Sequence, residues 1–415
     1  MNQPGWEEGA LWRGRHRVIS ALGVTQILAW GSSYYLMAVL AQPIASATGW
    51  SYGWVIGGLS LGLLVSGLVS IRVGRLIDDY GGRPVLATSS VFLAVGLAIL
   101  AAAPNLAVYV FAWLVLGVGM GAGLYDAAFS TLGRLYGPGG RRAITTLTLW
   151  GGFASTVCWP LSALLVDMAG WRGTCLIYAG LQLVVALPLH LILLPAETPR
   201  HRAAPVATPR IDAAPAMAAA TRTRLVVLMA AIVTTMGVVA ATWSVHLITI
   251  LEARGMTVAA AVALGALVGP SQVGARVVEM LGGGRYHPIW TLGAAVVLVA
   301  LGLGLLWAGF VLPALALIAY GAGNGIFSIA RGTLPLALFG SEGYARLMGR
   351  LAMPSLIAQA LAPSAVALLM QMSGAHAALS LLLALATANV LAVALLWALV
   401  GRLVTSEGAE SRLRA

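Results

Sequence analysis

The sequence carries little charge for its size. Only 9% of its 415 residues are charged, compared with about 25% in soluble domains. Hydrophobic residues make up 60% of the chain, and the mean hydropathy is +0.92. Lysine is absent, so all 24 basic residues are arginines. This composition excludes an ordinary soluble domain and indicates a protein that crosses a membrane many times.

Chemistry-bearing motifs are also scarce. Cys158 and Cys175 are the only cysteines, and both lie inside apolar runs, which argues against a disulfide framework or a thiolate metal site. The sequence has no Walker loop, zinc-ligand spacing or nucleophile elbow. Its net charge of +11 is spread over short loops rather than clustered. We therefore expect no enzyme activity, no cofactor, no metal site and no nucleic-acid partner.

Long apolar runs fill most of the chain. Crossing the hydrocarbon core of a bilayer takes about 20 helical residues. The first run, from Val18 to about Leu40, is too long for the apolar region of a signal peptide. The runs predict an all-α polytopic membrane protein with twelve transmembrane helices, at about 17–43, 51–72, 84–103, 106–134, 143–168, 173–194, 223–251, 257–281, 288–308, 311–339, 346–373 and 376–401.

The arginines test this count, because basic residues favour the cytoplasmic loops of membrane proteins. If the predicted helices alternate in direction, twenty arginines fall on one side and only Arg172 and Arg254 on the other. The remaining two, Arg276 and Arg331, lie inside helices. We therefore expect both termini on the cytoplasmic side of a bacterial-type inner membrane.

A segment rich in proline and arginine divides the twelve helices into two sets of six. Its apolar content is too low to pack, which predicts a cytoplasmic linker. Short echoes relate the two sets, such as the Gly-x-Gly pattern at Gly121 and again at Gly323. The predicted domains are a six-helix bundle at 1–194, the linker at 195–222, and a second six-helix bundle at 223–415 that ends in a short cytoplasmic tail.

A charged, glycine-rich stretch joins the second and third predicted helices. Gly74, Asp78, Gly81 and Arg83 have the spacing G-x3-D-x2-G-x-R, which resembles the loop between helices 2 and 3 in the major facilitator superfamily of secondary transporters. Asp79 stands where that family usually has a basic residue. The resemblance implies two pseudo-symmetric six-helix bundles, alternating access, and a conformational gate at the four motif residues. The alternative is a solvated charged turn.

We expect this stretch to form a tight surface hairpin of about ten residues, in which Gly74 and Gly81 supply backbone freedom. Asp78 can then face the positive N-terminal end of a neighbouring helix, and Arg83 can bond carbonyls or a carboxylate.

Polar residues fall on one face of every third predicted helix. These are helices 1, 4, 7 and 10, and the resemblance implies that they line a central cavity. The candidates for substrate binding on these faces are Gln26, Trp30, Tyr34, His246, Asn324 and Arg331. His246 has a second interpretation, as a structural residue bonded to a neighbouring carbonyl.

Asp126 and Arg331 are ionisable residues well inside predicted helices 4 and 10. A charge at the centre of a membrane helix costs about 2.5 to 3.5 kcal/mol on insertion scales, so such residues usually have a function. Asp126 is the preferred proton carrier. The alternative is that Asp126 pairs with Arg331 as a static tie between the two bundles.

Arg276 and Glu279 lie in predicted helix 8. Arg276 resembles the arginine that holds the substrate carboxylate in monocarboxylate- and oxalate-type facilitators, although Gln272 and Val277 replace the acid and the proline that flank it there. The resemblance implies a carboxylate ligand. Alternatively, Arg276 pairs with Glu279 three residues along the helix. Glu279 is a second candidate for proton coupling.

We expect a monomeric, proton-coupled transporter of a small organic anion, with the solute, the proton and the lipid bilayer as its partners. Two alternatives remain open: an exporter of drugs or other toxic solutes, and a sensor that binds a ligand without moving it. Trp113 disfavours the exporter, because drug-proton antiporters usually have an arginine at that place. Trp159-Pro160-Leu161 also lacks the glycines of their proline motif.

Overall fold

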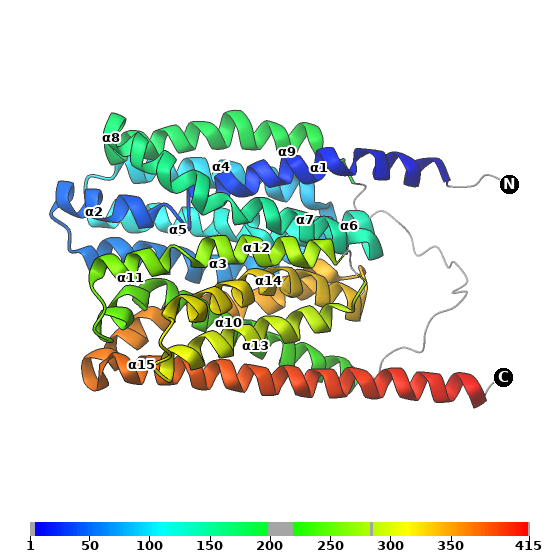
Figure 1. The fold of residues 1–415 in the computed structure, drawn as a ribbon. Coiled ribbons are helices and arrows are strands. Elements are labelled where there is room, and N and C mark those ends of the chain that lie inside the picture. Colours follow the sequence, from blue (N-terminus) through cyan, green and yellow to red (C-terminus); the bar gives the residue numbers. More distant parts are fainter. Residues whose placement is uncertain (1–4, 198–218, 283–284, 414–415) are drawn as a thin grey trace.

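The computed structural model describes residues 5–197, 219–282 and 285–413, which form helices and no strand. The helices run roughly along one common axis (Figure 1). Helix α1 (Gly5–Gly31) begins, and helix α15 (Tyr344–Leu413) ends, at the same end of the molecule. We call this end the terminal side and the opposite end the far side.

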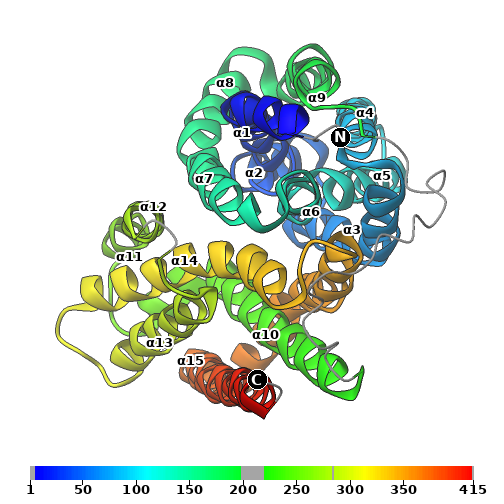
Figure 2. The same cartoon turned by 90° about the vertical axis from the view of Figure 1, so that its right-hand side faces the viewer.

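The elements form two bundles that lie beside each other when viewed along the helix axes (Figure 2). The first bundle contains α1, α2 (Met37–Thr48), α3 (Tyr52–Tyr80), α4 (Gly82–Ala102), α5 (Leu106–Gly123), α6 (Tyr125–Tyr136), the 3-10 turn η1 (Gly137–Gly139), α7 (Gly140–Gly152), α8 (Ala154–Leu181), the π-helical η2 (Gln182–Ala186) and α9 (Leu187–Leu193). The second contains α10 (Ala219–Glu252), α11 (Val258–Gly265), α12 (Val268–Leu281), α13 (Pro288–Trp307), α14 (Pro313–Phe339) and α15. Most of the predicted linker, 198–218, lies outside the described residues.

Eight segments of the described chain are long and apolar enough to cross a membrane. Two of them, Leu106–Leu193 and Tyr344–Arg402, contain more than one crossing. The chain reverses inside these segments at Gly137, Gly170 and Gly374, whose φ angles of 50°, 68° and 79° favour glycine. With α1 and α2 as a further crossing, the arrangement is consistent with the predicted twelve helices in two bundles.

Four of the predicted crossings are interrupted near mid-length. Each break directly follows a glycine: Gly31 ends α1, Gly123 ends α5, Gly152 ends α7 and Gly265 ends α11. Glycine favours the helix about 1 kcal/mol less than alanine does, so a helix is most easily interrupted there. The predicted crossings at 17–43, 106–134, 143–168 and 257–281 are therefore each built from two helical segments. Hydropathy detects the length of a run and not its continuity.

The two bundles contact each other mainly toward the terminal side. α3 packs against α15, α7 packs against α12 and α14, and α6 packs against α15. One apolar cluster of the first bundle incorporates Leu336, Tyr344, Ala345 and Met348 from the second. Among the described residues, α2, α8 and α11, which extend to the far side, make none of the principal contacts between the bundles. The structure is therefore closed on the terminal side.

Candidate functional site

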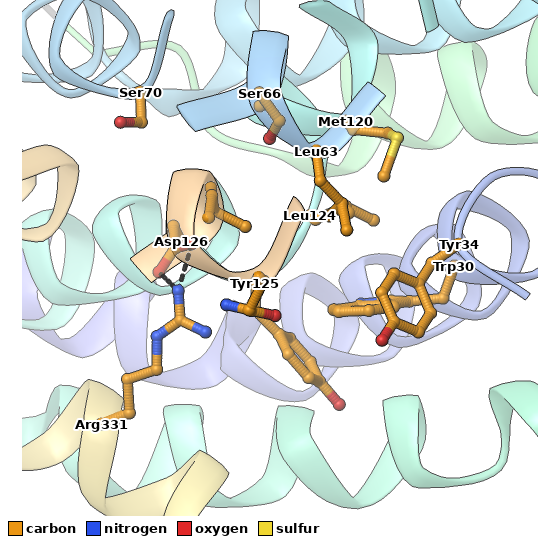
Figure 3. A pocket seen from close by; sticks show the side chains of 13 residues that line it. Trp30, Tyr34, Leu63, Ser66, Ser70, Met120, Leu124, Tyr125, Asp126 and Arg331 are labelled. Carbon is orange, nitrogen blue, oxygen red and sulfur yellow. Dashed lines mark hydrogen bonds and ion pairs between the residues drawn. The ribbon is translucent and has the colours of Figure 1, made fainter. Parts of the chain in front are cut away.

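An ion pair joins the two bundles in the interior. Both carboxylate oxygens of Asp126 accept from Nη2 of Arg331 at 2.5 Å (Figure 3). Asp126 lies in the first turn of α6, where the positive end of the helix dipole stabilises a carboxylate. The break after Gly123 creates this helix end, so the break places the carboxyl of Asp126 at the start of a helix.

A small, partly open cavity of about 40 Å³ lies beside this ion pair. The volume suits a few water molecules rather than an organic solute. Trp30 and Tyr34 line the cavity together with Asp126 and Arg331, so the structure brings four of the predicted site residues together (Figure 3). The other lining residues are Leu63, Ser66, Ser70, Met120, Gly121, Leu124, Tyr125, Leu356 and Gln359.

Gln26 lies behind this cavity and is buried. Its Nε2 donates to the carbonyl of Gly123 at 2.6 Å, and its Oε1 accepts from the indole of Trp30 at 3.2 Å. Gln26 therefore satisfies a carbonyl at the broken end of α5 and fixes the orientation of Trp30. These contacts make it a positioning residue in this state.

Arg276 is a buried guanidinium whose acceptors are main-chain carbonyls. Nε donates to Gly325 O at 3.0 Å, and Nη1 donates across the interface to Thr148 O at 2.9 Å. A Cβ at Gly152 would overlap with Nη1, so the glycine is what allows α7 to approach so closely. Within the described part of the chain, no ion pair involves Arg276.

The expected alternative of a local pair between Arg276 and Glu279 is wrong. Glu279 accepts from the Thr291 hydroxyl at 2.7 Å and lies 3.6 Å from Nη2 of Arg141, an arginine of α7 in the other bundle. Arg141 also donates to Tyr286 O. The two side chains of α12 diverge, because Arg276 turns into the interface while Glu279 meets partners nearer the terminal side.

His246 and Asn324 do not line the cavity around Asp126. The Nε2 of His246 lies 2.9 Å from Pro363 O, which belongs to the same bundle. This contact matches the structural interpretation of the histidine. Asn324 is half-buried on α14, two turns before Arg331.

The stretch from Gly74 to Arg83 differs from the expected ten-residue hairpin. α3 continues to Tyr80 and α4 begins at Gly82, so Gly81, with φ 88°, is the only non-helical residue. Gly74 is helical, and the prediction of backbone freedom there was wrong. Its missing side chain instead lets α3 approach the backbone of Ala345. Hydrophobic pattern could not reveal this contact, because Ala345 is 271 positions away in the sequence.

Asp78 does face a helix N-terminus, as expected. Its Oδ2 accepts from the backbone N–H of Arg346 in the first turn of α15 at 3.2 Å and lies 3.3 Å from Nε of the same residue. Arg134 donates to the carbonyl of Asp78 and pairs with Glu197. Arg134 therefore takes the role expected for Arg83, for which the described contacts give no polar partner.

Sequence reasoning missed several arginines that tie separate segments of the chain together. Arg134, Arg141 and Arg346 were counted only as topology markers. Arg134 donates to the carbonyl of Asp78 and Arg346 to the side chain of Asp79, both on α3, and Arg141 donates to Tyr286 O in the loop before α13. Their partners Glu197 and Glu279 are distant in sequence, so no spacing rule relates them. The sequence contains 13 acidic and 24 basic residues, so each acid has several arginines as possible partners. This excess of arginine was the only sequence signal that the acids would be paired.

Comparison with known proteins places this geometry in a family. The model of the Major Facilitator Superfamily matches residues 22–288. No curated protein sequence matches the chain.

Several solved structures share the fold. A human organic anion transporter, MFSD10 (TETRAN), is 17% identical with a TM-score of 0.70, over 91% of this chain and 99% of the other. FucP in its outward conformation is 15% identical with a TM-score of 0.68, over 90% and 97%. The proton:xylose symporter XylE is 10% identical with a TM-score of 0.67, over 93% and 95%.

Proposed function

The chain belongs to the major facilitator superfamily, and from that premise we propose that it is a proton-coupled secondary transporter of a small organic anion. The proposal rests on one observation above all. Arg276 is a buried arginine that forms hydrogen bonds with carbonyls and is left without an acidic partner in the described chain.

The charge inventory of the interior supports an anionic solute. Asp126 is neutralised by Arg331, and Glu279 lies beside Arg141. Arg276 then remains as a positive charge with no described counter-charge. Because burying an uncompensated charge is costly, the site favours a ligand that supplies the negative charge. A guanidinium presents a planar fork that matches the two oxygens of a carboxylate.

The Asp126–Arg331 pair supports coupling to protons. The two residues come from different bundles, so their pair must open when the bundles move apart on this side. A proton on Asp126 removes the attraction to Arg331 and thereby favours that opening. Loss of the proton then restores the closed interface. This sequence of events links one proton to one conformational cycle.

We assign the terminal side to the cytoplasm of a bacterial-type inner membrane, because the arginine-rich loops lie there. The described state is then closed to the cytoplasm. Asp78, bonded at the N-terminus of α15, stabilises that closure as a gate. Of the similar structures, XylE is described as a proton symporter and MFSD10 as an organic anion transporter. These descriptions are compatible with proton coupling and with an anionic solute, respectively.

Uptake by proteoliposomes with an imposed pH gradient tests the proposal. Radiolabelled lactate and benzoate serve as anions, glucose as a neutral solute and tetraethylammonium as a cation. Liposomes that contain the Asp126→Asn protein correct for passive diffusion of the weak acids. We expect accumulation of at least one anion above that control. Movement of the cation alone supports an exporter, and binding without accumulation supports a sensor, and either result refutes the proposal.

A further inference from the structure

Aromatic rings form a continuous wall on the first bundle. The ring of Trp30 lies 5.3 Å from that of Tyr34, 5.9 Å from that of Tyr35 and 5.1 Å from that of Tyr125, measured between centroids. Tyr35 continues the series to Trp159, 6.1 Å away. Centroid spacings of 4.5 to 7 Å are typical of favourable aromatic contacts. We call these five residues the aromatic wall.

The wall connects two cavities. At one end, Trp30, Tyr34 and Tyr125 line the small cavity beside Asp126. At the other end, Trp159 is half-exposed and lines an open cleft of about 540 Å³ between α2 and α8. That volume lies within the usual range for small-molecule sites. The cleft lies in the far half of the first bundle, where α2 and α8 extend.

The inner end of the wall meets the unpaired positive charge. The hydroxyl of Tyr125 donates to Thr148 O at 3.4 Å, and the same carbonyl accepts from Arg276 at 2.9 Å. A Cβ at Gly151 would overlap with the Tyr125 hydroxyl, so this glycine permits the approach. A flat apolar surface and a guanidinium therefore lie side by side.

We propose that the substrate is an aromatic carboxylate, whose ring stacks on the aromatic wall while its carboxylate binds Arg276. This inference rests on the proposed function and narrows its substrate class. Aromatic rings also attract cations. Here the nearby charge argues against a cation, because Arg331 already engages Asp126 and Arg276 lacks an acidic partner among the described residues.

Equilibrium binding to the detergent-purified full chain at pH 7 tests the inference. The probes are benzoate, cyclohexanecarboxylate and acetate, which share a carboxylate, together with benzyltrimethylammonium as an aromatic cation. Benzoate and cyclohexanecarboxylate have similar size and differ chiefly in the π-system. A favourable aromatic contact predicts that benzoate binds about 2- to 12-fold more tightly than cyclohexanecarboxylate.

Substitutions locate the preference on the wall. Trp30→Leu and Tyr35→Leu are expected to reduce the affinity ratio of benzoate to cyclohexanecarboxylate to about one, and Trp30→Phe, which keeps a ring, to retain the ratio. Trp290→Leu is the matched control, because Trp290 is half-exposed and contacts only Trp397 among the described aromatic pairs, and both of these residues belong to the second bundle, away from the wall. The Phe variant also reports the role of the ring if a Leu variant does not fold.

The outcomes separate the inference from the proposed function. If cyclohexanecarboxylate and acetate bind as well as benzoate, the aromatic inference fails and the anion proposal stands. If no carboxylate binds, or if benzyltrimethylammonium binds best, both fail. A benzoate preference that survives in both Leu variants, or that is equally lost in Trp290→Leu, also overturns the inference.

Discussion

Gly74 should control closure of the terminal side. The Cβ of an alanine at this position would overlap with the carbonyl oxygen of Ala345 and lie 3.0 Å from its carbonyl carbon. Both are backbone atoms, which cannot turn away as a side chain can. In Gly74→Ala the helices α3 and α15 must therefore separate locally. Over-packing of this kind costs about 1 to 3 kcal/mol.

This cost applies only to the closed state, so it shifts the balance between the two states. One to three kcal/mol corresponds to a change of about 5- to 150-fold in the ratio of closed to open molecules. Gly57→Ala is the matched control, because it lies on the same helix with open space around the added Cβ. Both substitutions also raise helix propensity equally.

A reporter cysteine at Ser70 measures the shift. Ser70 is buried in the interface, where its hydroxyl donates to Gly349 O at 3.0 Å. The native Cys158 and Cys175 are buried, so their background reaction with an impermeant maleimide is expected to be slow. Labelling of Ser70→Cys from the terminal side should accelerate with Gly74→Ala and stay unchanged with Gly57→Ala. Equal labelling in both backgrounds refutes the reasoning.

Three further predictions follow from the same contacts. Asp126→Asn removes the charge that holds Arg331 and should abolish uphill accumulation while sparing solute exchange; accumulation that persists moves the proton to another group. Asp78→Asn should lower turnover several-fold at unchanged ligand affinity, because only the closed state uses its contact with Arg346; normal turnover in a well-expressed variant excludes the gate. Partial burial of the imidazole and, to a lesser degree, the charge of Arg141 lower the pKa of His287, whose Nδ1 accepts from a backbone N–H at the start of α13. Below about pH 6.5 the unfolded chain therefore binds a proton at this histidine that the folded chain does not bind. Acidification should then lower the melting temperature of the wild type more than that of His287→Asn. Parallel pH profiles of the two melting temperatures would contradict this.

The fold could be predicted from the sequence because the thickness of the bilayer sets the length of every membrane-crossing helix. Runs of about 20 apolar residues and the uneven arginine distribution each reflect a strong solvation cost. The breaks inside these helices could not be predicted in the same way. Glycine occurs throughout these helices, and the residues packed around each glycine decide whether the helix breaks there. At Gly123, for example, the carbonyl that the break leaves free accepts a hydrogen bond from Gln26.

Part of the candidate site could be predicted from the sequence. Asp126, Arg331, Trp30 and Tyr34 share a cavity because helical periodicity aligns polar residues on one face. The partner of Arg276 could not be read from periodicity. Its i+3 neighbour, Glu279, was the nearest acid in the sequence, but the fold offers that acid a hydroxyl and an arginine from other helices.

The central claim is that Arg276 holds the negative charge of the solute. The most direct test is equilibrium binding of acetate, cyclohexanecarboxylate and benzoate to the wild type, Arg276→Lys and Arg276→Gln. The account predicts that the carboxylate bound most tightly by the wild type binds at least about tenfold more weakly to Arg276→Lys, because an ammonium lacks the planar fork. Binding to Arg276→Gln should be lost. Wild-type affinity in Arg276→Gln would contradict the account.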